Sequence, residues 1–214
     1  MNRRILILSL IIFPVSISNT VLASGDPIEG KSIYATCVAC HGQDGEGLQA
    51  TNSPRLAGLH DWYLLSQLQK FRSGLRGANP EDTFGAQMVP IAKALQNEQA
   101  LQDVVAYIGT LKASSPPRTE TSGFMDPVRA QETKCWNCHG TKGQGLKEAF
   151  KGIDGPRLAG QHDWYLIRQL KNFKAGIRGD LKDKGGLEMR VRAKVMLEDD
   201  QMIKDIVAYI GTLE

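Results

Sequence analysis

The feature that most constrains the fold is an internal repeat running through most of the 214 residues. The segment SPRLAGLHDWYLLSQLQKFRSGLRG from Ser53 matches GPRLAGQHDWYLIRQLKNFKAGIRG from Gly155. DVVAYIGTL from Asp103 and DIVAYIGTL from Asp205 keep the same offset of 102 residues. Such a duplication predicts two similar domains of roughly 100 residues each rather than one large one.

The segment between the repeats predicts where the domains meet. Residues 112–123, KASSPPRTETSG, are rich in Ser, Thr, Pro and Gly, a composition that sustains neither a helix nor a strand. We therefore expect a first domain at 24–113 and a second at 114–214, with this linker at their junction.

Residues 1–23 are typical of a secretory signal peptide cleaved after Ala23. They have a basic start, an apolar stretch from Ile5 to Val15, and small residues before the cleavage point. An uncleaved membrane anchor is the alternative, but the apolar run is well short of the roughly 20 residues that a spanning helix needs. No later segment is apolar enough to span a bilayer, so we expect no transmembrane segment in the mature chain. The signal peptide predicts that this chain is exported to the periplasm.

The hydrophobic periodicity within each repeat is helical. Apolar residues three and four positions apart predict a C-terminal amphipathic helix in each domain, at Leu101, Val104, Ile108 and Leu111 and at Ile203, Ile206, Ile210 and Leu213. A middle helix is expected after N-caps at Asp61 and Asp163, and a first helix after a cap at Asp26. Strand-like alternation is missing, so the sequence predicts small all-α domains whose few core residues need another group in the middle.

Two five-residue motifs, called the pentads below, indicate what that group is. CVACH at 37–41 and CWNCH at 135–139 contain all four cysteines, and Cys-x-x-Cys-His is the attachment signature of c-type haem. The paired thiols reach two vinyl groups on one porphyrin edge, and the adjacent imidazole reaches the iron. The sequence thus predicts two covalent c-type haems on Cys37, Cys40, Cys135 and Cys138, with His41 and His139 as iron ligands.

A disulfide or redox-active pair and a zinc site with four cysteine ligands are the alternatives. The exported compartment permits a disulfide, but neither a disulfide nor a redox pair explains His41 and His139. Zinc ribbons usually separate their pairs by about 15 to 20 residues, whereas here the pairs belong to different copies of the repeat. Covalent haem is the interpretation that accounts for both pentads.

A second iron ligand should lie late in each domain and recur. Met88 is the only methionine of the first domain. Matching the Ala-Lys pairs of the two domains places Met189 opposite Met88. The offset between these segments is one residue shorter than in the neighbouring repeat blocks, so Met196 is the runner-up. Met125 and Met202 have no partner in the first domain and are assigned as linker or core residues.

His60 and His162 form another repeated pair and would give bis-His haems if they were the second ligands. We disfavour this alternative because each lies beside a helix start, where an imidazole more often caps the helix or faces solvent. It would also leave Met88 without a role.

The chain resembles the dihaem class I cytochromes c of the cytochrome c4 family over its whole mature length. The resemblance rests on the CxxCHG runs, on DGEG and KGQG, and on the PRLAG blocks, the FRSGLRG and FKAGIRG helix ends, the Met-x-x-x-Ala-Lys segments and the AYIGTL helices. It implies two tandem cytochrome c domains about a pseudo-twofold axis, with haem propionates near the interface. It further implies that the carbonyls of Pro54 and Pro156 accept hydrogen bonds from Nδ1 of His41 and His139.

The resemblance also suggests haem-edge or propionate contacts. These residues are Arg55, Arg157, Trp62, Trp164, Tyr63 and Tyr165, and for any one of them surface or core packing is an equal alternative.

One departure from the family pattern concerns the second domain. The first domain has Gly30, Ile33 and Tyr34 ahead of its pentad, where a small residue allows a close helix crossing. The second has Val128, Gln131 and Glu132 there. We expect its first helix to be short, displaced or differently packed, so equal potential or exposure of the two haems is not assumed.

The predicted function is electron transfer without substrate conversion. No acid, base or nucleophile constellation is visible, and nothing resembles a nucleic-acid patch. The domains carry net charges of −2 and +3. This modest polarity is compatible with orientation on a charged partner, but ordinary solvated faces are the favoured interpretation. The resemblance implies a periplasmic shuttle between a membrane quinol-oxidising complex and an acceptor such as a haem-copper oxidase, and weak membrane-surface association is compatible with it.

Two alternatives remain open. One is a dihaem electron-accepting subunit of a periplasmic dehydrogenase, such as a flavoprotein that oxidises sulfide. The other is a catalytic dihaem peroxidase or thiosulfate-oxidising cytochrome, which would need an open or unusually ligated iron. The paired methionines argue against the catalytic alternative.

Overall fold

The computed structural model describes residues 24–214 except 113, 120–121 and 214. The predicted signal peptide, residues 1–23, lies outside the described residues. None of the helices in the described part is long and apolar enough to cross a membrane.

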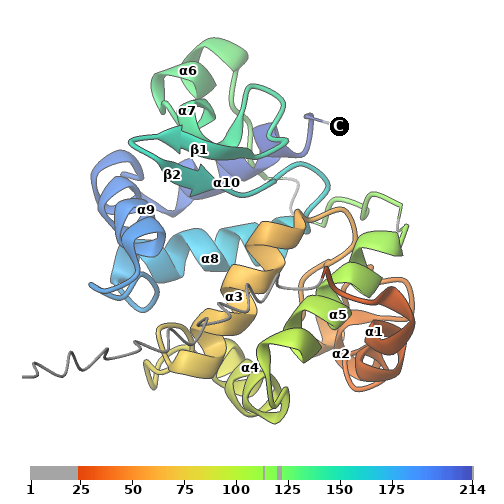
Figure 1. The fold of residues 1–214 in the computed structure, drawn as a ribbon. Helices are drawn as coiled ribbons and strands as arrows, with labels where there is room; N and C mark the ends of the chain where they lie inside the picture. Colours follow the sequence, from red (N-terminus) through yellow and green to blue (C-terminus); the bar gives the residue numbers. More distant parts are fainter. Residues whose placement is uncertain (1–23, 113, 120–121, 214) are drawn as a thin grey trace, which may run out of the picture.

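The first unit is helical (Figure 1). Its elements are α1 (Pro27–Tyr34), α2 (Val38–His41), the short 3-10 helix η1 (Gln49–Thr51), α3 (Asp61–Ser73), α4 (Thr83–Ala94) and α5 (Glu98–Thr110). The Asp26 side chain accepts a hydrogen bond from the amide of Ile28 and caps α1, and Pro27 is the first helical residue, as predicted. The predicted C-terminal helix is α5, capped by Asn97.

The second unit repeats this order with one addition. Its elements are α6 (Pro127–Glu132), α7 (Trp136–His139), β1 (Leu146–Phe150), β2 (Ile153–Gly155), α8 (Asp163–Ala175), α9 (Lys184–Met196) and α10 (Asp200–Ile210). The strands form an antiparallel hairpin in which Leu146 pairs with Gly155. An isolated bridge between Leu48 and Ser53 occupies the equivalent place in the first unit. The hairpin therefore extends a pairing that both units share, and it uses the four residues by which the second copy is longer. The two units are mainly helical as predicted, but the expectation of no strands is wrong at this inserted segment.

The middle helices begin one residue earlier than predicted. Asp61 and Asp163 are the first helical residues rather than N-caps, and the N-cap positions belong to His60 and His162, whose side chains do not cap. Each aspartate instead accepts a hydrogen bond from the amide of the next residue. Both helices end at a glycine with positive φ, Gly74 or Gly176.

The methionine segments form helices that the hydrophobic pattern did not predict. Asp82 caps α4 through the amide of Gly85, and Asp183 caps α9 through the amide of Gly186. The internal Pro90 and the glycines of both segments weaken a helical pattern in the sequence. The caps show that α4 and α9 correspond with an offset of 101 residues.

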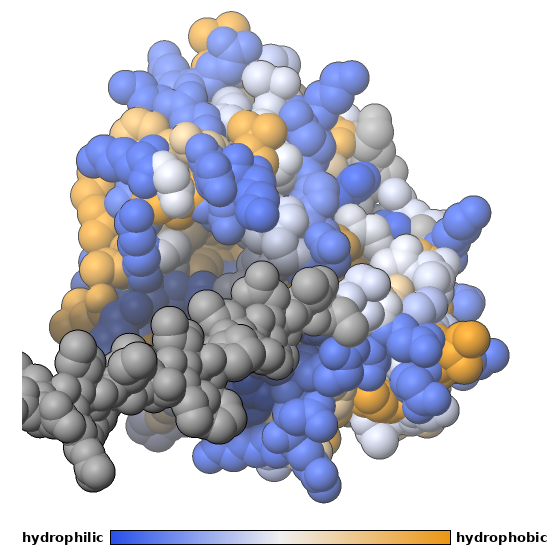
Figure 2. Space-filling view, viewed as in Figure 1, coloured by the Kyte–Doolittle hydropathy of each residue, from blue (hydrophilic) through white to orange (hydrophobic). Residues whose placement is uncertain are grey.

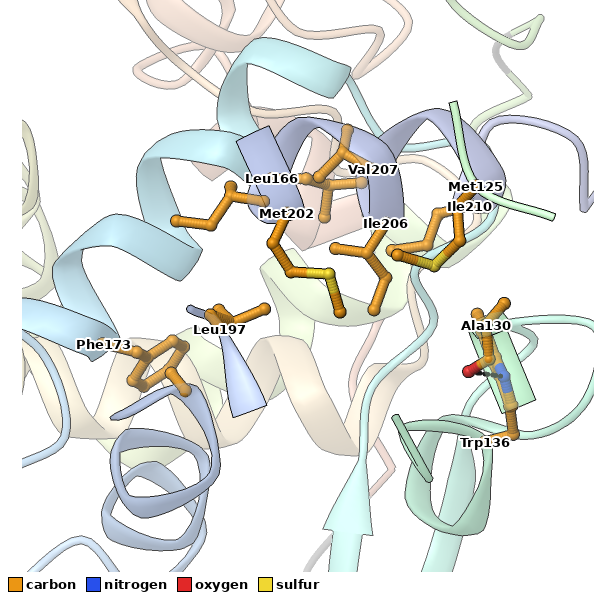
Figure 3. Packing of buried hydrophobic residues seen from close by; sticks show 12 residues of the cluster. Met125, Ala130, Trp136, Leu166, Phe173, Leu197, Met202, Ile206, Val207 and Ile210 are labelled. Carbon is orange, nitrogen blue, oxygen red and sulfur yellow. Dashed lines mark hydrogen bonds between the residues drawn. The ribbon is translucent and has the colours of Figure 1, made fainter. Parts of the chain in front are cut away.

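Each unit has its own apolar core. The first core contains Tyr34, Leu64, Val104, Val105 and Ile108. In the second, Met125 and Met202 point into a cluster with Leu166, Ile206 and Ile210 (Figure 3). Met125 and Met202 are 6% and 9% exposed, which confirms that they are packing residues.

Polar side chains cover most of the face seen in Figure 2, and apolar side chains gather along the edge that α9 forms. Val191 and Val195 on this helix are 50% and 74% exposed. Described residues of the linker region, 112, 114–119 and 122–123, contain neither a helix nor a strand.

Candidate haem sites and the interface between the units

The two pentads end in the same local structure. Each histidine is the last residue of a short helix, α2 or α7, and the following glycine, Gly42 or Gly140, has a positive φ that turns the chain away. His41 and His139 are 5% and 4% exposed. The backbone therefore brings each imidazole into the interior of its unit directly after the cysteine pair.

A backbone carbonyl orients each of these imidazoles. Nδ1 of His41 lies 2.8 Å from the carbonyl oxygen of Pro54, and Nδ1 of His139 lies 2.7 Å from that of Pro156. A carbonyl oxygen only accepts, so Nδ1 carries the proton and donates it, which leaves the lone pair of Nε2 free to bind a metal. The proline blocks thus have the orienting geometry that the resemblance implies.

Burial keeps these imidazoles neutral. It lowers the pKa of His41 and His139 below the usual range, and the hydrogen bonds to the carbonyls only partly oppose this. A neutral imidazole is the form that binds iron. Burial also raises the pKa of the Cys37 and Cys135 thiols.

The arrangement of the cysteines bears on the zinc alternative. All four are free of disulfide bonds. Within the described part of the chain no three His, Cys, Asp or Glu side chains are grouped so that they could hold a metal ion, so the four-cysteine zinc alternative has no site. The residues fit two separate haem sites instead.

A cavity of about 330 Å³ lies beside the pentad of the second unit, and residues of both units line it. Cys135, Cys138 and His139 line the cavity, and both Met189 and Met196 on α9 line it as well. The two methionines are seven residues apart and therefore lie on the same face of the helix. The structure thus brings the predicted ligand and its runner-up to the cavity. In the first unit Met88 is half-buried on α4, the helix equivalent to α9.

The hairpin closes the second site more tightly than the first. Gly155 in β2 packs directly on Cys138, so that a Cβ at this position would collide with the Cys138 backbone. Gly152, Ile153 and Asp154 also line the cavity. Cys138 is accordingly buried, whereas Cys40 in the first unit is exposed.

The suggested haem-edge residues divide into two groups. Trp62 and Tyr63 of the first unit, with Arg157 and Tyr165 of the second, line the second cavity. Arg55 donates from Nη1 to the carbonyl oxygen of Gly160, 2.9 Å away, so its contact lies across the interface. Trp164 stacks on His162, with ring centroids 4.8 Å apart.

His60 and His162 face the opposite unit. Nε2 of His60 donates to the carbonyl oxygen of Gln144, and Nε2 of His162 donates to that of Glu46, each at 2.8 Å. The two bonds are equivalent under the pseudo-twofold repeat. Neither imidazole caps its helix, so that part of the expectation is wrong. Each one remains partly exposed and joins the two units.

Two arginines that the sequence analysis did not single out add further bonds across the interface. Arg76 lies 3.0 Å from the hydroxyl of Tyr165, and Arg178 lies 3.4 Å from that of Tyr63. Burial acts to raise the pKa of Tyr165, but the charges of Arg76 and Arg178 outweigh it and leave that pKa lowered. The available clue was the repetition of both arginines at the ends of FRSGLRG and FKAGIRG.

Two helical units, each with a buried, carbonyl-oriented imidazole directly after a Cys-x-x-Cys pair, define a c-type cytochrome with two haem sites. Comparison with known proteins agrees, because the family model for cytochrome c matches residues 28–112 and 129–214. The chain belongs to this family, and within it to the cytochromes c4, and it carries two covalently bound c-type haems for electron transfer.

Three relatives support this assignment. The chain is 34% identical to cytochrome c4 of Azotobacter vinelandii over all of both chains. It is 33% identical to a thiosulfate dehydrogenase electron acceptor of Stutzerimonas stutzeri, over 87% of this chain and 88% of that protein. Its structure matches the crystal structure of reduced cytochrome c4 from Pseudomonas stutzeri with a TM-score of 0.64 and 30% identity, covering 89% of this chain and all of the other.

Proposed function

We propose that this cytochrome is a periplasmic shuttle that carries single electrons from a membrane donor, such as a quinol-oxidising complex, to an acceptor such as a haem-copper oxidase. The observation that carries the proposal is the second site, where the buried imidazole of His139, directly after two cysteines, lines one cavity with the methionines of α9. The first unit repeats the same sequence blocks and the same order of helices. Each bound haem supplies the one-electron chemistry. The periplasmic location rests on the signal-peptide pattern of residues 1–23.

The roles of the chain's own residues follow from this geometry. Cys37 and Cys40 would attach the first haem, and Cys135 and Cys138 the second. His41 and His139 would bind the irons through Nε2, held by the carbonyls of Pro54 and Pro156.

Methionine would close the other side of each site and exclude substrate. We assign Met88 to the first and Met189 to the second, because the caps at Asp82 and Asp183 place these methionines at the same distance along equivalent helices. The residue equivalent to Met196 is Leu95, which packs in the first core and offers no sulfur. A six-coordinate site of this kind favours a carrier over an enzyme.

Replacement of single methionines tests the ligand assignment. Met189→Ala should produce high-spin ferric haem at one of the two sites, detected by optical and paramagnetic resonance spectra, and Met88→Ala should do so at the other. Met196→Ala is the matched control and should stay low-spin. A low-spin Met189→Ala protein together with a high-spin Met196→Ala protein would move the assignment to Met196. Rapid cyanide binding by the unmodified protein would contradict closure.

A dedicated electron acceptor of a dehydrogenase is the second candidate function. It is favoured by the similarity to the thiosulfate dehydrogenase electron acceptor of Stutzerimonas stutzeri. Purification from the native cells separates the two candidates. A free carrier is expected to elute alone, whereas constant copurification with one dehydrogenase would favour the dedicated acceptor.

A further inference from the structure

An ion pair between the units joins the middle helix of one to the methionine helix of the other. Nζ of Lys70, on α3, lies 2.8 Å from Oδ1 of Asp183, and the two side chains are 23% and 11% exposed. The same carboxylate oxygen accepts a hydrogen bond of 3.0 Å from the amide of Gly186. One carboxylate therefore caps α9 and also binds the cation of the other unit.

This ion pair belongs to the wall of the second cavity. Lys70 and Asp183 both line the cavity, together with His139 and Met189. One face of α3 lines this cavity, and its residues are Trp62, Tyr63, Ser66, Gln67 and, at the end, Lys70. The first unit thus completes the pocket of the second, and Lys70 is the cation that it contributes there.

Within the described residues, the equivalent place in the first unit has no such ion pair. Asn172 is the repeat equivalent of Lys70, and its Nδ2 lies 3.5 Å from Oδ1 of Asp82, the cap of α4. The caps of the two methionine helices therefore have different partners across the interface, an ammonium group in an ion pair for α9 and a neutral amide for α4. A cation also lies near the cap of α4, because Arg168 stacks on Phe84 at 4.6 Å and the charge of Asp82 acts on it, but it forms no ion pair with Asp82. The sequence difference between Lys70 and Asn172 makes the pseudo-twofold arrangement electrostatically unequal.

We propose that Lys70 is a positioning residue for Met189 and that its charge raises the reduction potential of the second haem relative to the first. The proposal rests on the ligand assignment above. Reduction adds one negative charge, which a nearby cation favours, and the partial burial of this pair limits screening by water and salt. The hydrogen-bonded cap transmits the position of Lys70 to the first turn of α9, and Met189 follows one turn later.

The test uses the holoprotein with Lys70→Gln, which keeps a long polar side chain and removes the charge. Potentiometric titration with paramagnetic resonance readout should show the electron distribution shifted toward the first haem by about two- to fivefold, the range expected for a partly exposed ion pair. Cyanide should also displace Met189 faster. The Met88→Ala and Met189→Ala proteins assign each signal to its domain.

Two further variants make the result specific. Lys70→Arg keeps the charge and should restore both the potential and the cyanide rate. Asn172→Lys places a cation opposite Asp82 and should raise the potential of the first haem alone. An unchanged second potential in Lys70→Gln, an equal shift of both haems, or an unchanged first potential in Asn172→Lys would overturn the proposal.

The ligand assignment is checked separately, because its failure would have a different signature. In the unmodified protein both ferric haems should show the weak far-red absorption of His/Met coordination. If the unmodified protein lacks that band at the second haem, Met189 is refuted as the ligand, whatever the Lys70→Gln protein shows.

Discussion

Trp136 takes the place in the second unit that Tyr34 takes in the first. The Tyr34 ring lies 5.3 Å from that of Tyr107 at an angle of 55°, and the Trp136 ring lies 5.3 Å from that of Tyr209 at 58°. Tyr107 and Tyr209 are equivalent in the repeat, but Tyr34 precedes its pentad and Trp136 lies inside its own. A residue between the two cysteines thus supplies the aromatic contact that the altered first helix lacks.

A single substitution should reveal the contribution of this ring. Trp136 is 8% exposed, and its Nε1 donates to the carbonyl oxygen of Ala130 at 3.0 Å. Trp136→Ala should lower the free energy of unfolding of the second domain by about 3–5 kcal/mol, because it leaves a large cavity. Trp136→Phe keeps most of the packing and should cost less. Chemical unfolding of the holoprotein measures both, and equal losses would show that the hydrogen bond dominates.

At the scale of elements, the first helix distinguishes the units as expected from the sequence. α1 has eight residues and crosses α5 so closely that a Cβ on Gly30 would collide with the carbonyl group of Asp103. α6 has six residues and carries no glycine. The predicted difference in length and packing is confirmed, and its physical cause is the loss of the small residue at the crossing.

Gly30→Ala should therefore destabilise the first domain. Alanine favours helix formation, but here its methyl group would force α1 away from α5, at a cost of about 1–3 kcal/mol. Gly109→Ala in α5 is the matched control, because nothing lies within 4 Å of the added Cβ. That control should stabilise the protein by up to about 1 kcal/mol. Thermal unfolding followed by circular dichroism measures both, and effects of the same sign would contradict the crossing argument.

At the scale of the whole molecule, the units are joined by reciprocal bonds rather than by a shared core. His60 bonds to Gln144, and His162 bonds to Glu46, which is its mirror contact. Arg76 and Arg178 repeat the same reciprocity on the tyrosines of the opposite unit. Duplicated side chains can satisfy each other in this way only when the two copies face one another.

Loss of one of these histidines should weaken docking between the domains. Each bond contributes about 0.5–1.5 kcal/mol, and the His162 bond is the less exposed of the two. We expect His162→Ala to reduce the cooperativity between the unfolding of the two domains more than His60→Ala does. Scanning calorimetry measures this as separation of the transitions. A larger effect of His60→Ala would contradict the ranking by burial.

The sequence by itself determined the duplication, the all-α class and the pentads with their histidines. These features are local, since Cys-x-x-Cys-His lies within one helical turn and the repeat is visible as identity at a constant offset. The first, middle and C-terminal helices followed from caps and from spacings of three and four residues. The helices around Met88 and Met189 did not, because glycines and Pro90 hide their pattern.

Only the tertiary structure decided what each unit contributes to the other. The partners of His60, His162, Arg76 and Arg178 are far away in the chain, and no local pattern encodes them. The same holds for Lys70, which looks like an ordinary helix residue but reaches the cap of α9 in the second unit. Repetition could mark such residues as paired, but their contacts depend on how two folded surfaces meet, and that is set by long-range packing.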